Sequence, residues 1–129
     1  MNKRMLVALG LCVLVVAAGV VAAELKVENA AICTGIKDKA PDGAAEKFAP
    51  AVGKLYCFTK IMGGAEGTVI KHVWFHGEEK VDAMELKIGA ASWRTWSAKT
   101  IDPKLTGAWK VEVQDAEGKV LSTVNFTIE

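Results

Sequence analysis

Between Lys54 and Ile128, apolar residues recur at every second position, in short stretches separated by turns that contain glycine. This alternation is typical of β-strands, because successive side chains of a strand point to opposite faces of the sheet. A helical period is nearly absent from this part of the chain. The pattern predicts an all-β protein, an immunoglobulin-like antiparallel β-sandwich of about seven strands.

The expected strands follow one another at regular spacing. We expect them at residues 25–34, 54–61, 68–75, 81–88, 92–99, 108–114 and 120–128. The stretch 54–61 is apolar on both faces, which suits a central strand. Trp109 shares its parity with Val111 and Val113, so we expect it in the core.

The long connection from Gly35 to Gly53 differs from the rest. Pro41-Asp42-Gly43 predicts a turn, and the residues that follow allow a short helix around 44–48. We expect Phe48 to fix this connection onto the body of the domain.

The first 23 residues predict a signal peptide. Lys3 and Arg4 supply positive charge, the residues from Met5 to Val21 are uncharged and mostly apolar, and small residues end the segment at Ala23. Residues 24–129 then form a single domain, periplasmic or secreted in a bacterium. If the leader stays uncleaved, it is a single-span anchor and the only membrane contact that we expect.

The composition excludes some functions. Without Lys3 and Arg4, the 16 basic residues fall to 14, against 15 acidic ones. That balance predicts no nucleic-acid partner. No nucleophile elbow, phosphate-binding glycine loop or paired-carboxylate motif occurs, so we expect a protein that is not an enzyme and has no cofactor.

Two cysteines, Cys33 and Cys57, remain after the leader. A pair in an exported domain favours a disulfide. The bond would close a loop of 24 positions (57 − 33) and stabilise the domain by about 3.4 kcal/mol in the chain-entropy model. The alternative is two buried free thiols.

Arg94 is the only arginine after the leader, and it stands between Trp93 and Trp96. On a strand, Arg94 and Trp96 point the same way and Trp93 points the other way. The guanidinium and the indole suit a ligand-binding patch. The alternative is a structural ion pair of Arg94 with Glu112 or Asp82.

His72 and Trp74 share one parity of their strand, so they join Arg94 and Trp96 as candidate ligand-binding residues if the strands are neighbours. Two sets of residues compete for the interior. They are Leu55, Cys57, Val73, Phe75 and Trp93, or Tyr56, Phe58, Ile70, Trp74 and Trp96. The sequence does not decide between them.

We predict no metal site, because His72 and His76 lie about 13 Å apart along a strand and cannot share one ion. Two alternatives stay open. One is a periplasmic metal-handling protein that uses His72 or His76 with Met62 or Met84. The other is a small hydrolase built from Ser97, His72 and an aspartate.

Five sequence blocks carry a resemblance to a known family. They are Cys33-Thr34-Gly35-Ile36, Leu55-Tyr56-Cys57-Phe58-Thr59, His72-Val73-Trp74, Ser92-Trp93-Arg94-Thr95-Trp96-Ser97 and Thr106-Gly107-Ala108-Trp109-Lys110-Val111-Glu112-Val113. Over residues 30–128 the chain resembles the bacterial domain-of-unknown-function family number 2914. The resemblance implies a small β-rich domain of envelope or membrane-associated proteins and implies no reaction. Our leading hypothesis is a non-catalytic binding or adaptor module of the bacterial cell envelope, with a protein or glycan partner.

Overall fold

The computed structural model describes residues 24–129. The predicted signal peptide, residues 1–23, lies outside the described residues. Seven long strands match the seven predicted from the sequence, and the all-β prediction is confirmed. They are β2 (Lys26–Cys33), β6 (Lys54–Met62), β7 (Thr68–His76), β8 (Glu79–Ile88), β9 (Ser92–Thr100), β10 (Gly107–Asp115) and β11 (Val120–Ile128).

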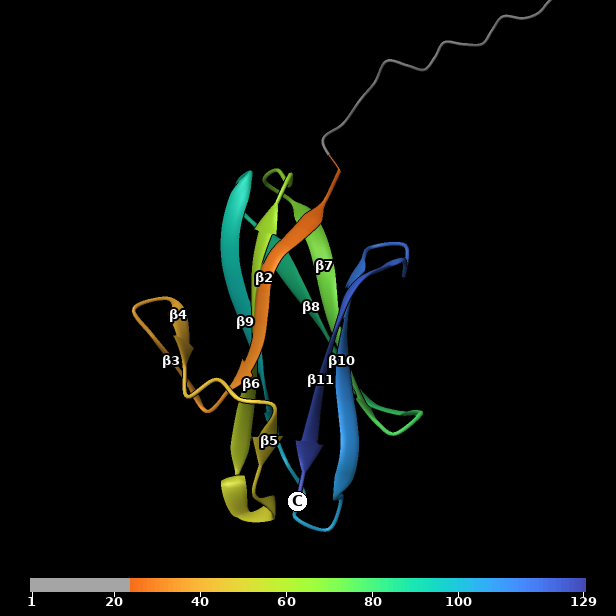
Figure 1. Ribbon diagram of the computed structural model, residues 1–129. Helices are drawn as coiled ribbons and strands as arrows, with labels where there is room; N and C mark the ends of the chain where they lie inside the picture. The colour runs from red at the N-terminus through yellow and green to blue at the C-terminus, as the bar shows by residue number, and fades with distance from the viewer. Residues whose placement is uncertain (1–23) are drawn as a thin grey trace, which may run out of the picture.

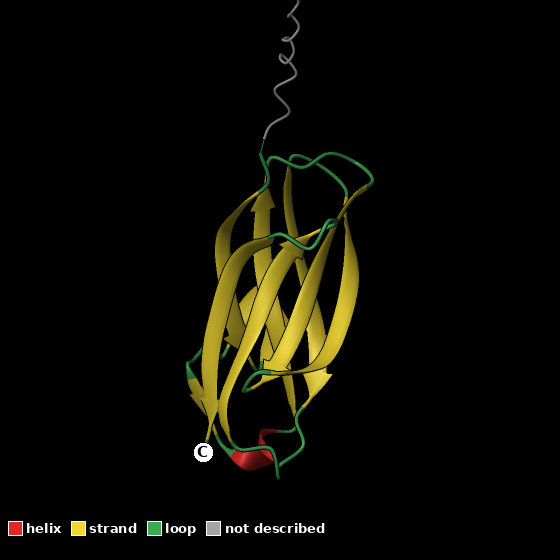
Figure 2. Ribbon diagram, turned by 90° about the vertical axis from the view of Figure 1, so that its right-hand side faces the viewer, coloured by secondary structure: helices red, strands yellow, loops and turns green. Residues whose placement is uncertain are grey.

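The strands form two sheets that face each other as layers (Figures 1 and 2). One sheet has the order β2-β6-β9, and the other has the order β5-β11-β10-β7-β8. The fourth long strand, β8, pairs with β7. In constant-type immunoglobulin domains the fourth strand lies instead in the sheet of the first, second and fifth strands. Strand β6 is the central strand of the smaller sheet, as predicted from the apolar residues on both of its faces.

The core fills the space between the sheets. Trp109, buried as predicted, stacks on Phe126 with ring centroids 5.7 Å apart, and Trp74 meets Phe126 edge to face at 6.2 Å. The smaller sheet contributes Leu55 and Cys57 to the same cluster. The interior therefore combines members of both predicted sets. The alternation within one strand shows which of its residues share a face, but only the pairing of the strands decides which of those faces points into the core.

The connection from residue 34 to residue 53 differs from the prediction. A hairpin forms from β3 (Gly35–Lys37) and β4 (Ala40–Asp42), so the turn lies at Asp38–Lys39 and not at 41–43. A short strand, β5 (Lys47–Phe48), and a 3₁₀ turn (Pro50–Val52) form here in place of the short helix that the sequence allows at 44–48.

Strand β5 pairs parallel with the end of β11. The backbone N–H of Thr127 donates to Glu46 O at 2.9 Å, and the N–H of Glu129 donates to Phe48 O at 3.0 Å. Main-chain pairing of this kind satisfies backbone groups that a short helix would leave unpaired at its ends. Phe48 is buried in the core cluster, so its predicted anchoring role is confirmed.

The predicted disulfide is wrong: Cys33 and Cys57 are both buried free thiols. The two cysteines lie on neighbouring strands, where Cys57 is opposite Ile32 and Cys33 is opposite Tyr56. Ile32 and Cys57 face the core together. The next residue, Cys33, therefore points to the other face of the sheet. Burial raises the pKa of both thiols.

The β3–β4 hairpin projects from the side of the smaller sheet (Figure 1). Phe58 is opposite Trp96 in the register and faces outward with it, yet only 3% of its surface is exposed. Pro41 and Ala40 of the hairpin border the same hollow as Phe58. The hairpin thus gives the outer face of this sheet a wall. Within residues 24–129, no helix has the length and apolar character needed to span a bilayer.

Candidate functional site

Arg94 and Trp96 lie on β9, an edge strand of the smaller sheet. Their cross-strand partners on β6 are Lys60 and Phe58. The inner face of the same strands carries Thr59 and Ser97, both buried. Arg94 is exposed and Trp96 is half-buried, so the two side chains stand together on the outer face, as the alternation predicts.

A hollow of about 480 Å³ adjoins this pair, and a second hollow of about 300 Å³ lies toward the hairpin. Lys39, Lys60 and Arg94 line both of them. Trp93 and Trp96 line only the larger hollow. Trp93 points to the other side of β9, but it reaches this space because β9 has no neighbour beyond it. We call this set the Arg94–Trp96 patch. Its members are Lys39, Lys60, Trp93, Arg94 and Trp96.

The predicted alternative, a structural ion pair of Arg94, is wrong. Asp82 binds Lys99 at 3.4 Å, and Glu112 binds Lys110 at 3.5 Å. Within residues 24–129, none of the ion pairs includes Arg94. The guanidinium keeps its donors available at the edge of the hollow.

His72 and Trp74, in contrast, do not join the patch. Both lie on β7 in the other sheet and are fully buried in the interior. The prediction that they share a ligand face with Arg94 and Trp96 is therefore wrong about their position. The physical reason is that β7 and β9 belong to opposite layers, so side chains that point inward from β7 meet the inner face of β9 and not its outer face.

Inside the sandwich, His72 and Trp74 form a polar cluster with Ser97 and Thr59. Ser97 Oγ lies 2.7 Å from His72 Nδ1, and Trp74 Nε1 donates to Ser97 Oγ at 3.3 Å. On the other side of the ring, His72 Nε2 lies 3.1 Å from Thr59 Oγ1, and that hydroxyl donates to the carbonyl of Thr95 at 3.1 Å.

For a neutral imidazole, only one arrangement of protons satisfies these contacts. Because the Thr59 hydroxyl donates its hydrogen to the carbonyl of Thr95, it accepts a hydrogen bond from His72 Nε2–H. His72 Nδ1 then carries a lone pair, which accepts from the Ser97 hydroxyl. The imidazole is neutral, in agreement with burial lowering the pKa of His72 to about 4. The cluster links the two sheets, because Thr59 and Ser97 come from one layer and His72 and Trp74 from the other.

This pairing of serine and histidine does not support the hydrolase alternative. A nucleophilic serine needs access to substrate and a histidine oriented by a third group, most often a carboxylate. Here the third partner of His72 is the hydroxyl of Thr59, and Ser97 is only 6% exposed. Its hydroxyl also accepts a hydrogen bond from Trp74.

Met84 lies opposite His72 on the neighbouring strand, but both histidines of the metal-handling alternative are engaged in other contacts. Both ring nitrogens of His72 are engaged in the polar cluster. His76 Nε2 donates to Thr106 O at 2.7 Å, and its ring lies 5.2 Å from that of Trp109. Among residues 24–129, no group of three or more His, Cys, Asp and Glu side chains is arranged to hold a metal ion.

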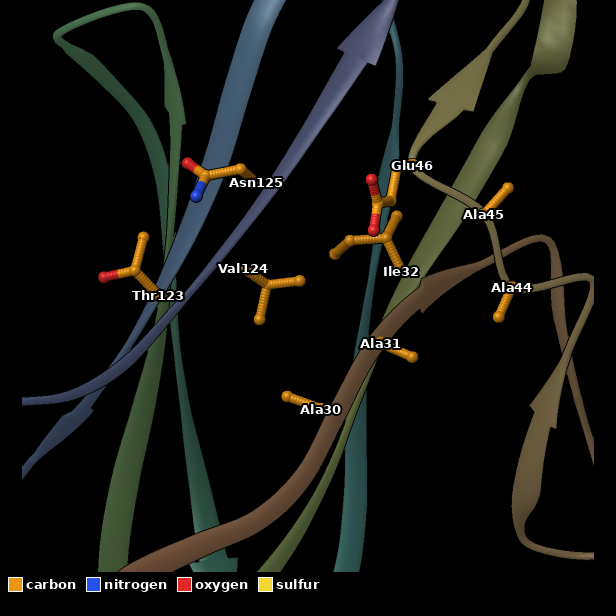
Figure 3. A pocket seen from close by; sticks show the side chains of 9 residues that line it. All are labelled: Ala30, Ala31, Ile32, Ala44, Ala45, Glu46, Thr123, Val124 and Asn125. Atoms are coloured by element: carbon orange, nitrogen blue, oxygen red, sulfur yellow. The ribbon is translucent and has the colours of Figure 1, made fainter.

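A third hollow, of about 550 Å³, separates the facing edges of the two sheets. Figure 3 shows it between β2, which carries Ala30, and β11, with Thr123 and Asn125 extending from the far side of β11. It exists because β5 pairs with only the last residues of β11. Its lining is mainly alanine and aliphatic, with Glu46 as its one charged side chain. It therefore offers less chemistry for recognition than the Arg94–Trp96 patch.

Sequence reasoning missed four members of the Arg94–Trp96 patch and the polar cluster, namely Lys39, Lys60, Thr59 and Trp93. Trp93 has the opposite parity to Arg94 and reaches the patch only because β9 is an edge strand. Lys60 shares a face with Arg94 only through the strand register, and Lys39 arrives on a hairpin that the sequence did not predict. Thr59 faces His72 from the other sheet. The sequence offers no signal for the last contact, because it depends on how the two layers pack.

The fold and the site define a small all-β sandwich domain with an exposed cationic and aromatic patch. Residues 67–128 match the model of the family described as "Protein of unknown function (DUF2914)". This match confirms the predicted resemblance, over a shorter span than the 30–128 expected. It includes β9 with Arg94 and Trp96, and it excludes Lys39 and Lys60.

Comparison with other proteins adds little about function. None of the curated proteins matches. Among solved structures, the domain is similar to part of a β-glucosidase from Listeria innocua in complex with glucose, at a TM-score of 0.45 and 11% identity. The similarity covers 81% of this chain, and the chain spans 16% of the length of that protein.

Proposed function

We propose that this protein is a non-catalytic binding or adaptor module of the bacterial cell envelope, exported by its leader to the periplasm or the exterior. Its ligand surface is the Arg94–Trp96 patch, and its partner is an envelope protein or glycan. The observation that carries the proposal is the exposed Arg94, which has no ion-pair partner among residues 24–129 and stands beside the half-buried Trp96 on a hollow of about 480 Å³.

Two physical arguments support the patch as a binding surface. An arginine held in a purely structural role has a carboxylate or carbonyl partner that fixes its guanidinium, and none of the ion pairs within residues 24–129 includes Arg94. A tryptophan that keeps part of its ring exposed beside such a donor offers both apolar area and a flat surface. The patch also lies on an edge strand beside a hairpin wall, which gives it the concave shape of a ligand site.

The experiment that tests this proposal is affinity capture from bacterial envelope extract. The mature domain, residues 24–129, is immobilised as wild type, as Arg94→Ala and as Trp96→Ala. Lys87→Ala is the matched control, because Lys87 is an exposed cation on the other sheet. We expect wild type and Lys87→Ala to retain the same partner and both patch variants to lose it while they stay folded. Equal capture by all four proteins contradicts the proposal.

A further inference from the structure

The charges around the Arg94–Trp96 patch are unequal. Its lining has three cations, Lys39, Lys60 and Arg94, and the one acidic side chain that lines either hollow is Glu28. Glu28 binds Lys60 at 2.9 Å and neutralises its charge. Lys39 and Arg94 keep uncompensated charge over the hollow. The patch is thus positive on a domain whose total charge is close to zero.

The backbone at Lys39 supports a role for this cation. Asp38 and Lys39 form the two-residue loop of the β3–β4 hairpin, with φ values of 54° and 60°. Both angles lie in the left-handed region, where hairpin loops strongly favour Asn, Asp and Gly. A lysine has no local reason to occupy the second position. Its side chain lines both hollows. The unfavourable backbone conformation therefore places the ammonium group of Lys39 at the ligand surface.

The remaining walls of the larger hollow are aromatic or hydroxylated. Trp93 is 38% exposed, Trp96 is half-buried, and Ser92 lines the same space. An indole face matches the apolar C–H face of a sugar ring, and a serine hydroxyl matches sugar hydroxyls. The planar fork of Arg94 matches a carboxylate through two parallel hydrogen bonds. This combination favours a ring that carries both apolar C–H groups and an anionic substituent.

We infer that the ligand of the Arg94–Trp96 patch is an acidic carbohydrate, a polymer or oligomer of sugar rings that bear carboxylates. The inference rests on the proposed function and specifies its partner. Arg94 and Lys39 bind the carboxylates, and Trp96 stacks on a ring between them. Lys60, already paired with Glu28, contributes less.

Titration calorimetry of the mature domain tests the ligand class with three probes of similar length. They are an oligomer of galacturonic acid, an oligomer of galactose, and an oligomer of glutamate. We expect only the uronate oligomer to bind, more weakly as ionic strength rises from about 0.02 to about 0.3 M, because salt screens exposed charges. Binding of the neutral oligomer with equal affinity overturns the inference. So does binding of the peptide alone, or of none of the three.

Three variants connect this binding to the patch. Arg94→Ala and Trp96→Ala should each weaken binding of the uronate oligomer by about tenfold. Lys39→Gly is more discriminating. It should weaken binding about three- to tenfold while the melting temperature stays equal or rises, because glycine adopts the left-handed backbone freely. Unchanged affinity in Lys39→Gly contradicts the assignment of Lys39.

The two proposals fail differently. If envelope capture depends on Arg94 and Trp96 but the uronate oligomer does not bind, the patch is a binding surface and only the carbohydrate assignment is wrong. If capture is independent of both residues, the proposed function itself is wrong.

Discussion

The hydroxyl of Ser97 and the Nδ1 atom of His72 lie 2.7 Å apart in the interior of the sandwich, on strands that belong to opposite sheets. A serine and a histidine at this distance resemble the core of a hydrolytic site. Here the hydroxyl donates to a neutral imidazole and accepts from Trp74, so the contact is saturated. Its physical effect is to fix how the two layers sit on each other, since a buried polar network is favourable only in the arrangement that satisfies all its members.

Stability should depend on pH through His72. Burial lowers its pKa from the ordinary 6.5 to about 4, so the unfolded chain binds a proton between these values that the folded chain does not. The contribution of neutral His72 is therefore complete above about pH 6.5 and is lost as the pH falls toward 4. The loss amounts to about 3 kcal/mol in the free energy of unfolding.

Denaturant unfolding of wild type and His72→Gln at pH 7, 5.5 and 4 measures this loss. The variant is less stable at pH 7 but declines less steeply, because it lacks the titrating group. His76→Gln is the matched control and keeps the steep decline, since His76 lies at a strand end and is only partly buried. Parallel pH curves for wild type and His72→Gln contradict a neutral, buried His72.

Removing the hydroxyl of Ser97 should destabilise the domain and leave the Arg94–Trp96 patch unchanged, because Ser97 lies in the interior. Ser97→Ala leaves the Trp74 indole N–H and His72 Nδ1 without partners in the interior. We expect a loss of about 2 kcal/mol or more, equivalent to about 10 °C in melting temperature. Ser92→Ala, an exposed site on the same strand, changes the stability by less than about 0.5 kcal/mol. A similar small effect for both serines would disprove the internal hydrogen-bond network.

Some features of the fold are readable from the sequence because they are local. Parity along one strand places Trp109 inward and puts Arg94 and Trp96 on the same side, and both hold in the structure. The number of long strands follows from the spacing of turns in the same way. None of these predictions requires knowledge of which strands are neighbours.

The errors involve contacts between strands or between layers. The sequence pattern groups His72 and Trp74 with Arg94, although their strand lies in the other sheet. The predicted disulfide is wrong because Cys33 and Cys57, on neighbouring strands, point to opposite faces of the sheet. Lys39 reaches the patch through a loop of two left-handed residues, for which the pair Asp38-Lys39 is a weak signal.

Replacement of tryptophan by phenylalanine separates the two faces of the sandwich. Trp74→Phe removes a buried indole N–H and part of a fully buried ring, so we expect a loss of about 2 kcal/mol. Trp96→Phe alters a half-buried ring on the outer face and should cost less than about 1 kcal/mol. Thermal melts of the two variants measure both losses. A larger loss for Trp96→Phe would contradict the account, because it would mean that Trp96 lies in the core and Trp74 on the outer face.

The thiols provide a chemical test. With Cys33 and Cys57 free and buried, thermal melts of the mature domain with and without reductant should coincide. A thiol reagent should react slowly with the folded domain, because burial raises the pKa of both groups and disfavours the thiolate. Denaturation should then release two reactive thiols. A melting temperature that falls on reduction would establish the disulfide that the structure lacks.

The most direct measurement of the ligand surface uses the indole N–H signals in a ¹H–¹⁵N spectrum of the mature domain. Trp74 and Trp109 are buried in the core, whereas Trp93 and Trp96 line the larger hollow of the patch. On addition of the partner eluted from the wild-type capture experiment, we predict that the signals of Trp96 and Trp93 shift and those of Trp74 and Trp109 stay in place. Binding that leaves the Trp96 signal unmoved, with shifts confined to backbone amides of β2 and β11, would contradict the assignment of the Arg94–Trp96 patch as the ligand surface.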